Sequence, residues 1–257
     1  MPSWNSEQYL KFSSERTQPA IDLALRVGIS GPHRIVDLGC GPGNSTAVLA
    51  HRWPNADLTG IDNSGAMLET AARDHPQWKW RKGDIATWRS EEPLDVVFSN
   101  AALQWVPDHA KLFPRLLAQV APGGALAVQM PANSDAPPHR LMRELAGTAA
   151  WRAHFVTVPQ EWQVHPPEFY YDALAAHTSR IDIWCTDYLH VLPSVDSIVE
   201  WYRGSGLRPW LDALPDEVTR EKFLAAYRAR LAPYFPARRD GRVLFPFRRL
   251  FVIAYRS

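Results

Sequence analysis

The segment from Ile35 to Thr46 limits the possible folds of this chain more than any other part of the sequence. It begins with a short apolar run, Ile35–Leu38, which contains one carboxylate, Asp37. Glycines then alternate at positions 39, 41 and 43, and Asn44 opens an amphipathic stretch. An apolar strand, a glycine turn and a helix start, in this order, predict the first β-α unit of a doubly wound α/β sheet. Glycines permit positive φ angles and let a ligand lie against backbone N–H groups.

The spacing of the turn and two carboxylates narrow the choice of ligand. The pattern is G-x-G-x-G, whereas a dinucleotide pyrophosphate is typically bound by G-x-G-x-x-G. Asp37 would be unfavourable beside a pyrophosphate but favourable beside a cation. Asp62 ends the expected second strand, Leu58–Asp62, where a carboxylate can bind ribose hydroxyls. Together these features resemble the S-adenosylmethionine (SAM)-dependent methyltransferases of the Rossmann-like class I fold. The alternative is a turn whose glycines serve geometry alone.

Composition excludes several other classes of protein. With 257 residues, 46% of them hydrophobic, the chain can form one large α/β domain or a core with a cap. A net charge of +1 argues against a general nucleic-acid binder, and two cysteines are too few for a disulfide framework. Residues 1–12 show no signal core, and no apolar run reaches membrane-spanning length. We therefore expect a cytoplasmic enzyme with no nucleic-acid or membrane partner.

The start of the chain is expected to be helical. Residues 4–12 predict a short helix with aromatic side chains on one side, and Pro19 should open a second helix over Ala20–Arg26. In the methyltransferases that the chain resembles, such a segment folds over the cofactor. The resemblance implies that Tyr9 and Arg16 cover the methionine end of SAM, and ordinary helix packing is the alternative.

Two later strands carry further candidate residues. Trp78–Ile85 is expected to be strand three, and its last residues, Asp84 and Ile85, offer adenine an acceptor for its amino group and an apolar surface. A plain turn role for Asp84 is the alternative. Leu94–Asn100 is expected to be strand four. Ligands of such sheets bind outside the carboxyl ends of the strands, so residues 100–105 should border the transferable methyl group.

The rest of the chain predicts further helices and strands in a fixed order. The first glycine turn leads into a helix that Pro54 stops, and Asn63 or Ser64 should cap a helix over Ala66–Arg73. Asp108 should cap a helix that runs to about Val120 and ends at Gly123–Gly124. The remaining expected strands are 125–130, 181–192 and 250–255. A helix should start at Pro137, and others should include residues 169–174 and 195–202. One more helix should have Phe223, Leu224, Tyr227 and Leu231 on its apolar side.

Motifs along nearly the whole chain resemble those of a narrower family. They comprise Trp4 and the segments 9–12, 15–16, 37–46, 104–109, 127–131, 206–211 and 249–251. The segments around Gln104 and Arg208 are more specific than the glycine turn, which many methyltransferases share. On these motifs the chain resembles the trans-aconitate 2-methyltransferase family.

The resemblance implies a fold and a division of the chain. The fold would be a mostly parallel Rossmann-like sheet whose last strand is antiparallel, with helical cap insertions. Residues 1–130 would form the SAM-binding core of a single methyltransferase domain. Residues 131–178 and 194–245 would form the substrate cap, and 181–192 and 249–256 the closing strands.

The resemblance also implies the reaction. A methyl group would pass from SAM to a carboxylate of trans-aconitate, or of a related small polycarboxylate, giving a monomethyl ester and S-adenosylhomocysteine. A carboxylate is ionised near neutral pH, so no general base and no metal is expected. The chain's residues would only position the two ligands. The nine scattered histidines are expected to be structural or surface residues.

The implied site has two parts. Cofactor residues would be Tyr9, Arg16, Asp37, Gly39, Gly41, Asn44, Asp62, Asn63, Met67, Asp84, Ile85 and Asn100. Acid-binding residues would be Gln104, Trp105, Tyr170, Arg208, Trp210 and Arg249. A simple helix-turn-helix corner with a solvated arginine is the alternative at Arg208. Two other functions stay open, methyl transfer to a neutral oxygen or carbon nucleophile and a non-catalytic SAM-binding regulator. The sequence makes no prediction of the oligomeric state.

Overall fold

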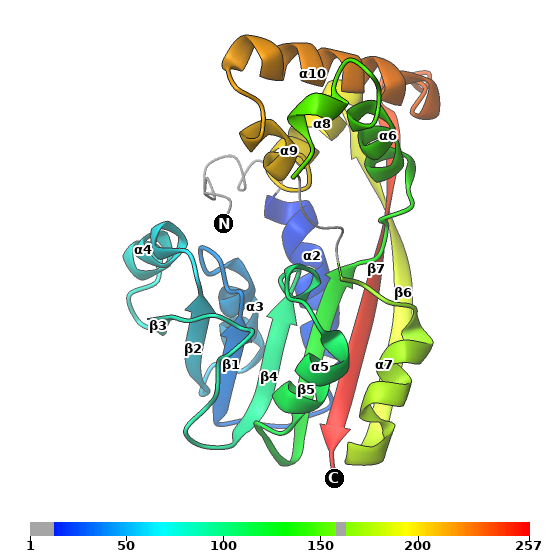
Figure 1. Ribbon diagram of the computed structural model, residues 1–257. Coiled ribbons are helices and arrows are strands. Elements are labelled where there is room, and N and C mark those ends of the chain that lie inside the picture. Colours follow the sequence, from blue (N-terminus) through cyan, green and yellow to red (C-terminus); the bar gives the residue numbers. More distant parts are fainter. Residues whose placement is uncertain (1–12, 158–162) are drawn as a thin grey trace. The chain divides into compact units, whose positions relative to one another are not determined.

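The computed structural model describes residues 13–157 and 163–257 of the chain (Figure 1). Internal contacts divide the chain into two compact units. The sheet unit comprises Ser13–Ala132, Trp162–Thr186 and Arg249–Ser257, and the helical unit includes Asn133–Glu161 and Asp187–Arg248. The subdivision into a cofactor core and a substrate cap concerns function and stays a prediction.

One seven-stranded sheet has the strand order β3-β2-β1-β4-β5-β7-β6. Neighbouring strands from β3 to β5 pair in parallel, and β7 pairs with β5 antiparallel. This confirms the expected Rossmann-like class, mostly parallel with an antiparallel last strand. The strand order reverses between β1 and β4, which is where sheets of this kind bind ligands. The strands are β1 (Arg34–Leu38), β2 (Asp57–Asp62), β3 (Lys79–Lys82), β4 (Leu94–Asn100), β5 (Val120–Pro131), β6 (Thr178–Leu192) and β7 (Val243–Arg256).

The helices of the sheet unit cover its two faces. In Figure 1, α5 and α7 lie in front of the strands and α2 and α3 lie behind them. These helices are α2 (Ser13–Arg26), α3 (Asn44–Arg52), α4 (Gly65–Asp74), α5 (His109–Leu117) and α7 (Pro167–Leu174), with short 3-10 turns η1 (Leu103–Trp105) and η3 (Ala175–His177). Ser64 caps α4, because its hydroxyl accepts from the Met67 N–H, as the sequence predicted.

The helical unit contains α6 (Pro137–Ala146), α8 (Val195–Arg203), α9 (Arg208–Asp212) and α10 (Glu217–Leu231), with η2 (Arg152–His154) and η4 (Ala232–Tyr234). The predicted apolar side of α10 is buried, at Phe223, Leu224, Tyr227 and Leu231. Gly206 lies in the turn between α8 and α9. A Cβ there would lie 3.2 Å from ring atoms of both His139 and Tyr202, so this glycine is needed for close packing.

Two expected element ends in the first half of the chain were wrong, and one expected helix there is not tested. Helix α2 begins at Ser13 and contains Pro19, because its buried residues pack well enough to offset the backbone bond that proline cannot make. Strand β3 ends at Lys82, since the carboxylate of Asp84 folds the chain into a turn by accepting from the Ala86 N–H. The expected helix over residues 4–12 lies outside the described residues.

The expectations around α5 also need correction. Asp108 precedes α5 but does not cap it, because its backbone is left-handed (φ 58°) and its carboxylate accepts from Lys111 Nζ at 2.7 Å. Helix α5 ends at Leu117, and Gly123–Gly124 belong to β5. A Cβ on Gly124 would lie 2.6 Å from the Asp95 carbonyl oxygen, so that glycine serves strand pairing. Similarly, β7 begins at Val243 instead of Leu250, because its alternate residues are buried from there on.

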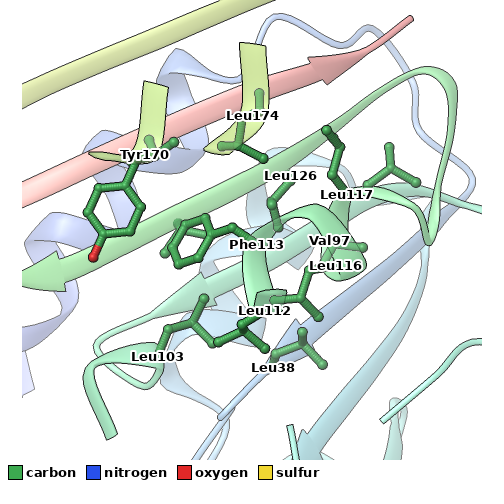
Figure 2. Close-up of a cluster of buried hydrophobic side chains, with 14 of the residues drawn as sticks. Leu38, Val97, Leu103, Leu112, Phe113, Leu116, Leu117, Leu126, Tyr170 and Leu174 are labelled. Carbon is green, nitrogen blue, oxygen red and sulfur yellow. The ribbon is translucent and has the colours of Figure 1, made fainter. Parts of the chain in front are cut away.

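The main apolar core lies between the sheet and helices α5 and α7. Figure 2 shows side chains of both helices directed into a cluster that also holds Leu38, Val97 and Leu126 of the strands. Phe113 and Tyr170 meet there with their ring centroids 4.6 Å apart. None of the helices that the structure describes is long and apolar enough to cross a membrane.

Candidate functional site

The glycine turn after β1 adopts a backbone that only glycine accommodates easily. Gly39, Gly41 and Gly43 have φ angles of 74°, 54° and 97°. A Cβ on Gly39 would lie 2.1 Å from the Cβ of Ala102, so this glycine lets the residues after β4 pack against the turn. Around Gly41, by contrast, no atom of the described residues, its two chain neighbours apart, lies within 4 Å of such a Cβ. The backbone at Gly41 is therefore open to a ligand.

Asp37 is buried beneath this turn, with 1% of its surface exposed. Its Oδ2 accepts from the Ser45 hydroxyl at 2.6 Å and from the Thr46 hydroxyl at 2.7 Å, which ties β1 to the first turn of α3. Its Oδ1 is buried, and no group in residues 13–157 or 163–257 hydrogen-bonds to it. Burial raises the pKa of Asp37 to about 6, against the lowering effect of the two hydroxyls. A cationic N–H donor would satisfy Oδ1 and favour the ionised form.

Asp62 closes the turn from the side of β2. Its Oδ2 accepts from the Gly41 N–H at 2.9 Å and its Oδ1 from the Ser64 N–H at 2.8 Å. Each carboxylate oxygen can accept a further bond, and the side chain is partly exposed. Nearby, Asn63 is exposed and Met67 is buried on α4. The predicted role of Asp62 with ribose hydroxyls is compatible with these bonds and stays a prediction.

Asp84 and Ile85 follow β3, as the predicted adenine site requires. Asp84 is exposed, and its Oδ1 accepts from the Ala86 N–H at 2.9 Å. Ile85 packs against the apolar cluster of the sheet unit. Asp84 therefore stabilises a turn, as the alternative interpretation expected. Binding of adenine by Asp84 and Ile85 stays a prediction.

The backbone is strained just beyond β4. Ala101 has a φ angle of 55°, which is unusual for a residue with a Cβ. The Gln104 amide holds this conformation, since its Nε2 donates to the Ala101 carbonyl oxygen at 2.7 Å. Asn100 Oδ1 and Gln104 Oε1 are buried, and no described residue donates to either atom. Strain and unsatisfied acceptors coincide where the sequence predicted the transferable methyl group.

Tyr170 is fully buried and makes internal hydrogen bonds. Its hydroxyl accepts from the His165 N–H at 3.1 Å and lies 2.9 Å from His109 Nδ1. His109 Nε2 faces the Leu103 carbonyl oxygen at 2.9 Å, so Nε2 carries the proton and Nδ1 accepts from tyrosine. Burial lowers the pKa of His109, which favours this neutral form. The contacts support a positioning role for Tyr170 behind η1, and contact with the acid stays a prediction.

The candidate arginines lie in different units. Arg208 begins α9 in the helical unit, where its side chain is 20% exposed and its Nε lies 3.9 Å from an Asp212 carboxylate oxygen. Trp210 packs edge-to-face on Phe155, with centroids 5.2 Å apart. Arg249 lies on β7 in the sheet unit, 3% exposed, and its Nη1 donates to Gln129 Oε1 at 3.4 Å.

Comparisons with known proteins identify the family. Residues 35–124 match a model of the methyltransferase domain. The trans-aconitate 2-methyltransferase of Azoarcus sp. (strain BH72) is 47% identical over 256 residues, covering 100% of both chains. That of Rhodopseudomonas palustris (strain BisA53) is 49% identical over 255 residues, covering 99% of each. The chain belongs to the trans-aconitate 2-methyltransferase family. The family resemblance predicted from the motifs is thereby confirmed.

A solved structure shows that the fold reaches beyond this family. The structure of geranyl diphosphate methyltransferase in complex with SAM superposes with a TM-score of 0.54. It covers 98% of this chain and 90% of that chain at 18% sequence identity. At this identity the likeness concerns the fold alone, which agrees with the strand order of the sheet.

Four further residues of the predicted site are either not described by the structure or partly exposed. Tyr9 lies outside the described residues, and Arg16 is in α2 with its side chain outside the description. Asn44 is the first residue of α3 and is partly exposed, and Trp105 of η1 is partly exposed as well.

Among the described residues, no group of three or more His, Cys, Asp or Glu is arranged to hold a metal ion.

Several residues beside the candidate site were not predicted from the sequence. Ser45 and Thr46 hold Asp37, and a pair of hydroxyls directly after a glycine turn was an available signal for this. His109 and Gln129 lie within the motif segments 104–109 and 127–131, but the motifs gave them no role, because their partners Tyr170 and Arg249 lie 61 and 120 residues away in the chain.

Proposed function

We propose that this chain transfers a methyl group from SAM to a carboxylate of trans-aconitate, giving a monomethyl ester and S-adenosylhomocysteine. The observation that carries the proposal is full-length identity of 47% and 49% to two trans-aconitate 2-methyltransferases. Similarity spread over the whole chain includes the helical unit as well as the glycine turn, which is common to many methyltransferases.

The residues present suit SAM. The open backbone at Gly41 and the remaining acceptor capacity of Asp62 would hold the nucleoside. The buried acceptors Asp37 Oδ1 and Asn100 Oδ1, which no described residue satisfies, suit a ligand that carries ammonium and sulfonium charge. When bound, SAM supplies an electrophilic methyl group on its sulfonium sulfur.

The chain has to position the ligands and exclude water, and it need not move a proton. The acceptor carboxylate is already ionised near neutral pH. His109, a buried histidine beside η1, has both ring nitrogens engaged, with Tyr170 and with the Leu103 carbonyl oxygen. It is therefore tied to the scaffold and is not poised as a general base. Alignment of two bound ligands can lower a reaction barrier substantially without acid-base chemistry.

Cationic partners are needed for the acid, because a tricarboxylate carries about three negative charges near neutral pH. Arg208 and Arg249 are the proposed partners, with Gln104, Trp105, Tyr170 and Trp210 bordering the acid. An arginine can hold a carboxylate bidentately and stays charged at any working pH.

The test is incubation with SAM and a panel of small di- and tricarboxylates, followed by mass spectrometry. A gain of one methyl group on trans-aconitate, with formation of S-adenosylhomocysteine, is expected. Methylation of neutral alcohols or carbon acids in a parallel panel, with none on the acids, would replace the proposed acceptor. Tight SAM binding with no turnover on either panel would instead indicate the regulatory alternative.

A further inference from the structure

A row of polar side chains crosses one face of the sheet at the carboxyl ends of its parallel strands. Asp37 pairs with Phe98, and Asn100 lies two residues further along β4, on the same face. Asn100 pairs with Gln129 on β5, and Gln129 pairs with Phe251, two residues from Arg249 on β7. We call Asp37, Asn100, Gln129 and Arg249 the polar row.

The row changes character from one end to the other. At the β1 and β4 end it presents carboxylate and amide oxygens, Asp37 Oδ1 and Asn100 Oδ1, which no residue that the structure describes satisfies. At the β5 and β7 end it presents N–H donors from Gln129 and Arg249. The Gln129 side chain is fully buried, and its Nε2 has no hydrogen-bond partner among the described residues. Hydrogen-bond acceptors therefore lie at the β1 and β4 end of the row, and hydrogen-bond donors lie at the β5 and β7 end.

Arg249 fixes the orientation of the Gln129 amide. Its Nη1 donates to Gln129 Oε1 at 3.4 Å, so the oxygen of the amide is directed at the guanidinium and Nε2 must point elsewhere. A buried N–H group without a partner is unfavourable, and such groups are rare in folded proteins. A ligand oxygen at this position would remove that cost.

We propose that Gln129, oriented by Arg249, donates its Nε2 hydrogen bond to a ligand carboxylate. The position fits, because Gln129 lies near the carboxyl end of β5, where sheets of this kind bind ligands. The charge fits, because a carboxylate beside Arg249 and Gln129 gains a cation and a neutral donor together. The inference rests on the proposed function and adds to it a recognition residue to which the sequence gave no role in the site.

Two carboxylates could occupy this position, that of the acceptor acid and that of the amino-acid end of SAM. The key variant is Gln129→Glu. Glutamate keeps an oxygen for Arg249 but loses the N–H donor and adds a negative charge. If Gln129 served only to hold Arg249, Gln129→Met, which loses that oxygen, should weaken binding more than Gln129→Glu does. If Gln129 binds a carboxylate, Gln129→Glu should repel it.

The experiment measures the SAM Kd by calorimetry, without acid, and the acid KM with SAM saturating. We expect Gln129→Glu to raise one of the two constants about tenfold or more, and Gln129→Met, which loses the donor without adding charge, to raise the same constant less. A rise in acid KM alone assigns the acceptor, and a rise in SAM Kd assigns the amino-acid end of the cofactor.

Gln119→Glu is the matched control. Gln119 precedes the first residue of β5, and its Oε1 accepts from the Ser90 N–H at 2.9 Å. Both constants should stay at the wild-type value in this variant. Wild-type levels of both constants in Gln129→Glu and Gln129→Met would overturn the inference while leaving the proposed function intact. If the wild type methylates no acid, the proposed function fails, and the SAM Kd alone then decides the role of Gln129.

Discussion

The two faces of the sheet differ most at the carboxyl ends of the same strands. On the face covered by α5 and α7, residues such as Leu38, Val128 and Leu250 join one apolar cluster (Figure 2). On the opposite face, their sequence neighbours Asp37, Gln129 and Arg249 form the polar row. Side chains alternate between the two faces along a strand. One residue of each adjacent pair therefore packs in the core, and the other is available for binding.

The two faces also differ in whether their buried polar groups have hydrogen-bond partners. Ser99 lies on the α5 and α7 face, and its buried hydroxyl donates to the Leu38 carbonyl oxygen at 2.8 Å. In the polar row, atoms of Asp37, Asn100 and Gln129 lack such partners among the residues described. An unsatisfied buried polar group costs about 1–3 kcal/mol. Without ligands the polar row lowers the free energy of unfolding, and burial of side chains on the apolar face has to offset this loss.

The largest expected effect is on the apolar face. Phe113 of α5 is fully buried, and its ring packs against that of Tyr170. Phe113→Ala leaves a cavity there and should lower the free energy of unfolding by about 3–5 kcal/mol. Urea denaturation followed by circular dichroism measures this loss.

Leu25→Ala is the control, because Leu25 of α2 is 65% exposed and its truncation should change stability by no more than about 0.5 kcal/mol. SAM affinity of the folded Phe113→Ala protein should stay near wild type. A variant that keeps full stability but loses SAM binding would reverse the roles given to the two faces.

The next largest effect concerns the loss of stability that burial of Asp37 in the polar row causes. The folded protein holds the Asp37 proton more tightly than the unfolded chain, since its pKa is raised from 3.8 to about 6. Ionisation therefore favours unfolding as the pH rises through this range, and the stability is lost above it. Asp37→Asn avoids that cost and keeps an oxygen for Ser45 and Thr46.

Without SAM, wild type should consequently lose about 3 kcal/mol of unfolding free energy relative to Asp37→Asn between about pH 4 and pH 7. Denaturant titrations at several pH values measure the difference. A difference that does not change with pH would show that Asp37 is not under strain in the ligand-free fold.

The sequence was sufficient for features that depend on near neighbours in the chain. Strand β4 has the expected bounds, and β1, the glycine turn and α3 follow from one continuous segment. The family resemblance correctly gave the mostly parallel sheet with its antiparallel last strand.

Features that depend on register between distant strands were not accessible. Gln129 reads as an ordinary residue of an apolar strand until its pairing with Asn100 and Phe251 is known. The same holds for Gly124, which resembled a helix stop but is required by the close approach of the Asp95 carbonyl oxygen. Local patterns cannot show which residue a side chain will meet.

A smaller effect tests whether the polar face extends to β2. Gly60 pairs with Asp37, so Asp62, two residues further on, lies on the same face. Asp62→Ala should weaken SAM binding by about 1.5–3 kcal/mol, the scale for hydrogen bonds to a charged group. Calorimetry measures it, with Asp57→Ala at the start of β2 as control, because Asp57 is exposed and pairs with Lys79. Unchanged affinity in Asp62→Ala would remove this residue from the site.

Arg208 tests whether recognition of the acid needs the helical unit in addition to the polar row. Lysine keeps the charge of Arg208 but cannot form the bidentate pair. Loss of one hydrogen bond, about 0.5–1.5 kcal/mol, predicts a rise in acid KM of about 2- to 12-fold in Arg208→Lys, with SAM affinity near wild type. If Arg208→Lys and Arg208→Ala both keep the wild-type kcat/KM for the acid, Arg208 is a solvated corner residue and recognition lies elsewhere.

The smallest expected effect is the absence of a pH dependence in kcat. His109 of α5 stays neutral because burial lowers its pKa. Asp37, in the polar row, has a pKa of about 6 in the protein alone, and a bound cation would lower that pKa further. The acceptor carboxylates are ionised as well, so kcat with both ligands saturating should be flat from about pH 6.5 to 8.5.

Steady-state rates over this pH range measure the profile of kcat, and single-turnover experiments show whether chemistry limits kcat. A limb near neutrality that disappears in His109→Gln would make His109 a participant in proton transfer and would favour a neutral acceptor over a carboxylate.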